Sequence, residues 1–135
     1  MQTTTFPAAP SNGQRKTGIV LSVIASLFLL MDSSMKILRL APAVAGTTEL
    51  GYPDSVVFGL GLLQIACLLL YVLPQSSILG AGLLTGYLGG AIATHVRVGS
   101  PLLTHTLFPT YVAALVWGGI WLREPRLRLL LPFHR

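Results

Sequence analysis

Residues 55–73 read SVVFGLGLLQIACLLLYVL, and Gln64 is the one strongly polar interruption of this apolar run. A helix needs about 20 mostly apolar residues to cross about 30 Å of hydrocarbon. The next four residues, PQSS at 74–77, are typical of a tight turn, and a second apolar stretch follows at once. Because so short a connection makes two helices antiparallel neighbours, we predict a helical hairpin within a membrane.

Three further stretches have the length and apolar character of membrane helices. The first precedes Pro42, and the last contains Pro109 in its first turns and both tryptophans near its end. Their ranges, with the stretch already quoted, are about 17–38, 55–73, 78–96 and 102–122. We therefore predict an all-α fold, an antiparallel bundle of four transmembrane helices that forms one integral membrane domain over residues 17–122. Within 78–96, Gly82, Gly86 and Gly90 form a flat face on which another helix can pack closely.

The flanking segments are polar or basic. We expect residues 1–16 to be a disordered cytoplasmic tail, 41–54 a loop and 123–135 a basic cytoplasmic tail. An even number of spans places both termini on one side. Six basic residues lie on that side and three on the other, which favours cytoplasmic termini: Arg15, Lys16, Arg123, Arg126, Arg128 and Arg135, against Lys36, Arg39 and Arg97. A cleaved signal peptide is the lesser alternative for the first span, because no small-x-small cleavage site follows it.

Composition excludes a water-soluble domain. Hydrophobic residues make up 53% of the chain and charged residues 10%, whereas a soluble domain carries about 25% charged residues. The net charge is +5, but the basic residues flank apolar segments, so the expected partner is the lipid bilayer and no nucleic acid. Cys67, the single cysteine, lies within an apolar run and is interpreted as a packing residue. No cofactor or metal is expected, because GxGxxG, Walker A, GxSxG, HxxxH and HExxH motifs are absent from the sequence.

Polar residues gather at the ends of the predicted spans on the non-cytoplasmic side. Ionisable residues at membrane depth usually face a bundle interior or a wet cavity, so we hypothesise a polar vestibule at this end. Its candidate catalytic residues are Asp32, His95 and His105. Its candidate ligand-binding residues are Lys36, Arg97, Glu49 and Tyr52 at this end, with Tyr87, Thr85 and Gln64 continuing the polar lining inward. The alternatives are a helix-end ion pair, because Asp32 and Lys36 have i, i+4 spacing, and interfacial histidines bonded to their neighbours.

Several short stretches resemble the DoxX-like family of small bacterial membrane proteins. They are ELGYP at 49–53, TGYLGGA at 85–91, THVRVG at 94–99, HTLFP at 105–109, WGGIWLR at 117–123 and PRLR at 125–128. The resemblance implies four membrane helices and a location in a bacterial inner membrane. It also implies a redox context, because the family's namesake is associated with a thiosulfate:quinone oxidoreductase, but it assigns no role to any residue.

Three functions are compatible with these features. The first is an accessory membrane subunit of a redox-linked system that binds a quinone or another small lipophile, with a redox partner subunit or a second copy as its protein partner. The alternative is a small intramembrane enzyme in which Asp32, His95 and His105 perform acid–base chemistry on a lipophilic substrate. Transport of a small solute ranks last, since four helices are few for a transporter.

Overall fold

The computed structural model describes residues 8–131, and within that range it contains helices and no strand. The predicted all-α fold is confirmed. In chain order the elements are α1 (Asn12–Ile37), α2 (Ala41–Glu49), the 3-10 turn η1 (Asp54–Val56), α3 (Val57–Val72), α4 (Ser77–Val98), the π turn η2 (Leu102–Thr106), α5 (Phe108–Arg123) and α6 (Pro125–Leu130).

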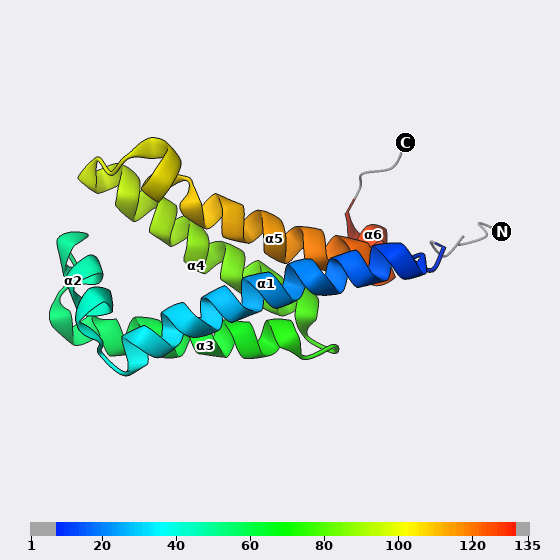
Figure 1. The fold of residues 1–135 in the computed structure, drawn as a ribbon, viewed down its shortest axis with the longest axis horizontal. Coiled ribbons are helices and arrows are strands. Elements are labelled where there is room, and N and C mark those ends of the chain that lie inside the picture. Colours follow the sequence, from blue (N-terminus) through cyan, green and yellow to red (C-terminus); the bar gives the residue numbers. More distant parts are fainter. Residues whose placement is uncertain (1–7, 132–135) are drawn as a thin grey trace.

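The four long helices pack side by side. Helix α1 contacts α3 and α5, and α4 contacts the same two helices from the other side. Figure 1 shows that the start of α1, the α3–α4 turn and α6 lie at one end of the molecule, while α2 and η2 lie at the other. We name these the inner end and the outer end, as names for places in the fold and not for sides of a membrane. The helices diverge toward the outer end, where longer connections join them.

Among residues 8–131, three segments are long and apolar enough to cross a bilayer: Asn12–Ile37, Asp54–Val72 and Ser77–Val98. Helix α5, which corresponds to the expected fourth span, has 16 residues. It begins later than expected because Pro109 occupies its first turn and residues 102–106 form the separate π turn.

The structure also corrects several expected boundaries. Helix α1 begins at Asn12, within the expected disordered tail, because Ser11 and Gln14 form a reciprocal capping box. The expected 41–54 loop contains α2, with Pro42 in the first turn where proline favours a helix. The expected basic tail contains α6, which Glu124 caps by accepting from the Arg126 backbone N–H. The remaining parts of the two expected tails, residues 1–7 and 132–135, lie outside the described residues.

Glycines determine where helices approach most closely. A Cβ atom at Gly18 would lie 2.7 Å from the Gly119 carbonyl oxygen, and one at Gly80 would collide with the backbone of Tyr71. These contacts join α1 to α5 and α3 to α4 near the inner end. The expected glycine face of α4 behaves differently, since a Cβ at Gly82, Gly86 or Gly90 would meet no atom within 4 Å.

Candidate functional site

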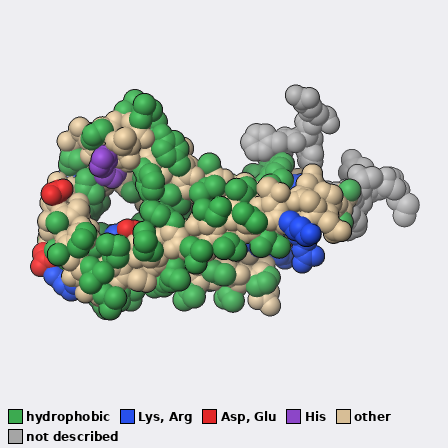
Figure 2. Space-filling view, viewed as in Figure 1, with side chains coloured by type: hydrophobic (Ala, Val, Ile, Leu, Met, Phe, Trp, Pro, Cys, Tyr) green, Lys and Arg blue, Asp and Glu red, His purple; other side chains and the backbone are tan. Residues whose placement is uncertain are grey.

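A cavity of about 800 Å³ lies between the diverging helices and beneath α2. Figure 2 shows the molecule hollowed at this end, with histidine on one side and acidic and basic atoms visible inside. Its volume is within the 300–1,000 Å³ range of small-molecule sites. One part of the wall is apolar and the rest is polar, which suits a ligand with an apolar body and a polar head. The larger apolar side chains of the lining include Phe28, Leu29, Leu60, Leu88, Phe108 and Val112.

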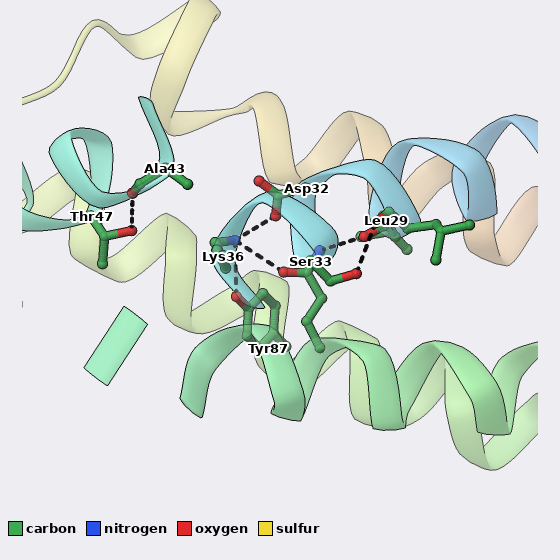
Figure 3. A network of polar contacts seen from close by, with 9 residues as sticks. Leu29, Asp32, Ser33, Lys36, Ala43, Thr47 and Tyr87 are labelled. Atoms are coloured by element: carbon green, nitrogen blue, oxygen red, sulfur yellow. Dashed lines mark hydrogen bonds and ion pairs between the residues drawn. The ribbon is translucent and has the colours of Figure 1, made fainter. Parts of the chain in front are cut away.

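Lys36 is the centre of the polar wall. Its ammonium forms an ion pair with the Asp32 carboxylate and donates to Gln64 Oε1 at 3.0 Å and to the Tyr87 hydroxyl at 3.3 Å. Figure 3 shows the Asp32 and Tyr87 contacts meeting at the Lys36 nitrogen. Gln64, in turn, donates from Nε2 to the Leu29 carbonyl oxygen at 3.2 Å. The cluster therefore joins α1, α3 and α4 through side chains that line one cavity.

The cluster lies near the middle of two helices. Tyr87 is the eleventh of the 22 residues of α4, and Gln64 is the eighth of the 16 residues of α3. At 1.5 Å per residue, Tyr87 is roughly 15 Å from either end of its helix. Gln64 is 1% exposed, and the Lys36 side chain is 15% exposed. The Lys36 ammonium therefore lies beside the middle of α3 and α4, although Lys36 is the second-last residue of α1.

A second set of polar side chains lies closer to the outer end. Thr94 donates to the Gly90 carbonyl oxygen, so the Tyr52 hydroxyl donates to Thr94 Oγ1 across 2.8 Å. The His95 and His105 rings meet edge to face with their centroids 6.1 Å apart. Each histidine uses Nδ1 in a hydrogen bond, His95 to Ser100 Oγ and His105 to Thr104 Oγ1. These bonds leave Nε2 of both rings for other partners.

Helix α2 covers the cavity and is held from two directions. At its base, Arg39 binds Asp54 through an ion pair and a 3.1 Å bond to the Asp54 carbonyl oxygen, which joins the segments before and after α2. Arg39 also has a positive φ of 53°, which is unfavourable for a residue with a side chain. On the far side, Arg97 donates to the Leu50 carbonyl oxygen at 2.8 Å. This last contact and the Tyr52–Thr94 bond connect the α2 segment to α4.

Eight of the ten residues proposed from the sequence line this cavity; the exceptions are Arg97 and Thr85. Arg97 points to the α2 segment instead, and Thr85 accepts from Trp117 Nε1 at 2.7 Å. The eight are Asp32, Lys36, Glu49, Tyr52, Gln64, Tyr87, His95 and His105. Across residues 8–131, no three His, Cys, Asp or Glu side chains are grouped in a way that could hold a metal ion.

Comparison with known protein families identifies the relatives of this chain. A model of the DoxX-like family matches residues 20–119, which span every residue that lines the cavity. The chain belongs to the DoxX-like family. Comparisons with curated proteins and with solved structures return no match. Family membership and the apolar helices together make this DoxX-like chain an integral membrane protein.

Three polar residues that line the cavity of this DoxX-like chain were not predicted from the sequence. Thr47, Thr94 and Ser100 all line it, and Thr47 and Thr94 are buried. Thr94 stands seven residues after Tyr87, a spacing that repeats on one helix face, so the pattern in α4 contained that signal. Thr47 showed no such spacing signal, because the segment that carries it was expected to be a loop.

A second polar network lies at the inner end, and its side chains form hydrogen bonds with one another and with the backbone. The Tyr71 hydroxyl donates to the Val116 carbonyl oxygen at 3.0 Å and therefore accepts from Ser22 Oγ at 2.9 Å. Arg123 donates to the same Ser22 oxygen and lies over the Tyr71 ring. Among the residues described, no buried side-chain nitrogen or oxygen lacks a hydrogen bond. This network therefore joins α1, α3 and α5.

Proposed function

We propose that this DoxX-like protein binds a small lipophilic molecule in the outer cavity and serves as an accessory membrane subunit of a redox-linked system. One observation carries the proposal: the Lys36–Asp32–Gln64–Tyr87 cluster lies halfway along α3 and α4 and lines a cavity with an apolar wall. Charges at membrane depth are costly and rarely retained without a function. A packed apolar core would not require this cluster, whereas a polar ligand head would.

The proposed topology has four crossings. Helix α5 and the preceding π turn together cover residues 102–123, which we propose as the fourth span of an antiparallel bundle. Both ends of the bundle's chain would then lie on the cytoplasmic side of a bacterial inner membrane, as the distribution of basic residues favours. The cavity would form a polar vestibule at the non-cytoplasmic end. Reporter fusions after residues 40, 75, 100 and 131 test this topology, and opposite signals at 40 and 100 would contradict it.

Binding is tested by narrowing the cavity without disturbing its polar groups. Ala91 lines the cavity one helical turn from Tyr87, whereas Ala93 is exposed and faces away from it. We expect Ala91→Phe to lower by at least about tenfold the affinity for the lipophile that copurifies with the chain. The same change at Ala93 is the matched control and should have no effect. Equal affinities in the two variants would place the ligand elsewhere.

A quinone is one lipophile that fits the proposal, because it has an apolar body and carbonyl acceptors, and its reduced forms also carry O–H donors. Lipid extracts of the purified chain, analysed by mass spectrometry, should contain a quinone that the Ala91→Phe chain lacks. The accessory role has a separate test: mild extraction of native membranes should recover a stoichiometric redox subunit. Recovery of the chain alone, or of a homo-oligomer, would count against that role and leave ligand binding intact.

The second candidate function is acid–base catalysis on the bound molecule. Its specific support is that Asp32, His95 and His105 line one cavity and that both imidazoles keep Nε2 free. Asp32 would act as the base and the histidines would exchange protons with the outer solution. In that case Asp32→Asn and His95→Ala would abolish turnover of the copurified lipophile and retain its binding. Unchanged composition of that lipophile after incubation with the native chain would refute catalysis.

A further inference from the structure

The polar cluster of the cavity also indicates what kind of head group fits it. Lys36 has three ammonium protons, and three acceptors already take them: Asp32 Oδ2, Gln64 Oε1 and the Tyr87 oxygen. An ammonium has no further donor to offer. Among the described residues of the lining, Lys36 is the one lysine or arginine. It is fully engaged within the chain, so an anionic head would find no free ammonium or guanidinium to pair with.

Two polar groups of the same cluster remain available. The Tyr87 oxygen accepts from Lys36, and the proton of this hydroxyl has no acceptor among the residues described. Hydrogen bonds in a chain polarise one another, so a phenol that accepts from an ammonium is a better donor. Asp32 uses Oδ2 for Lys36 and keeps Oδ1 unengaged, with 34% of its side chain exposed. The cluster thus offers one donor and one acceptor.

The charge of the Lys36 cluster is balanced before any ligand arrives. Asp32 and Lys36 cancel, and Glu49 is the remaining charged residue of the lining. Glu49 is exposed at the end of α2, so its attraction for a cation is weakened by water. Bringing a net charge to the mid-depth cluster would cost desolvation that no free counter-ion offsets.

We infer that the head group bound beside Lys36 is uncharged and carries a carbonyl-type acceptor for Tyr87 next to an O–H or N–H donor for Asp32. This inference rests on the proposed function, since it specifies the ligand of the same cavity. Fatty acids, phospholipid phosphates and alkylammonium ions are excluded from this position. The Lys36 charge acts through Tyr87 and makes no direct contact with the ligand.

The test uses four amphiphiles that share a twelve-carbon chain: dodecanamide, methyl dodecanoate, dodecanesulfonate and dodecyltrimethylammonium. Binding of each radiolabelled compound is measured to the full chain in nanodiscs, with empty nanodiscs subtracted for partition. The amide should bind best, the ester should bind about tenfold more weakly because it lacks a donor, and both ions should be weaker still. Sulfonate or ammonium binding as tight as that of the amide would overturn the inference.

Two charge variants sharpen the test. Asp32→Asn leaves Lys36 unneutralised and should raise sulfonate affinity by about tenfold, while Lys36→Met leaves Asp32 unneutralised and should raise ammonium affinity similarly. Head-group selectivity that is unchanged in both variants would refute the inference. Should either variant fail to fold, Tyr87→Phe keeps the ion pair and must weaken the amide and the ester equally. Absence of binding by all four compounds would refute the proposed function, and the inference with it.

Discussion

Replacing Lys36 with methionine tests whether the polar cluster is a coupled unit. Methionine keeps the length of the side chain and removes its charge and donors. The Asp32 carboxylate then loses its counter-ion, which costs about 3–5 kcal/mol for a buried pair; the lower end applies because 34% of the Asp32 side chain is exposed. Gln64 Oε1 also loses its donor in a residue that is 1% exposed, which adds about 1 kcal/mol. We expect a loss of about 4 kcal/mol in the free energy of unfolding.

A double-mutant cycle separates this coupling from simple truncation. The variant with both Lys36→Met and Asp32→Asn should lose about 2 kcal/mol less than the two single losses added together. Equilibrium unfolding in mixed micelles provides the measurement, with a denaturing detergent as titrant and the fluorescence of Trp117 and Trp121 as signal. Lys16→Met is the matched control, since Lys16 is exposed on the same helix. Equal losses at Lys16 and Lys36, or a coupling below about 0.5 kcal/mol, would refute the reasoning.

Three further predictions use the same unfolding assay. Tyr71→Phe removes a fully buried hydroxyl that bonds Ser22 and a backbone carbonyl, and it should cost about 1–3 kcal/mol; a change near zero would show that the network is dispensable. Gly119→Leu places a side chain against the Ser22 backbone nitrogen, which a Cβ would approach to 2.9 Å, and should cost about 2–3 kcal/mol through forced separation of α1 and α5. The Arg126 hydrogen bond and charge lower the pKa of Glu124, so its stabilising contribution is present above the ordinary pKa of a glutamate. That contribution is lost as the pH falls through the lowered folded pKa, and Glu124→Gln should flatten this part of the stability-versus-pH curve.

The helices were predictable from the sequence where the length of an apolar run is enough to determine the helix. The 55–73 run appears as Asp54–Val72, and the glycine-rich run after the turn appears as Ser77–Val98. The boundaries that failed depend on local capping, because a capping box extends α1 toward its N-terminus and a first-turn proline starts α2. Hydropathy does not detect such short-range hydrogen bonds.

The residues that line the candidate site were largely predictable from the sequence. The position of the Lys36 cluster along the helices was not. Placing ionisable residues at one end of the bundle grouped the right side chains, since eight of ten line the cavity. The sequence could not show that Lys36 reaches from the end of α1 to the middle of α3 and α4. That reach depends on the offset of α1 against its neighbours, and the offset is fixed by tertiary contacts such as Gly61 against Lys36 and Ile37.

The position of the cavity follows from where the helices are fastened. Near the inner end, a short turn joins α3 to α4, and Gly80 and the Gly18–Gly119 pair bring backbones into contact. At the outer end, α1 continues through α2 before α3 begins, and α4 continues through η2 before α5 begins. Helices held together at one end and joined by longer segments at the other diverge, as Figure 1 shows.

The space between the diverging helices would be lost to apolar collapse unless polar groups lined it. The Lys36 cluster supplies those groups where α1, α3 and α4 still approach one another. The close helix contacts at the inner end and the Lys36 cluster therefore act together, and altering either one should change the size of the cavity as well as the stability of the fold.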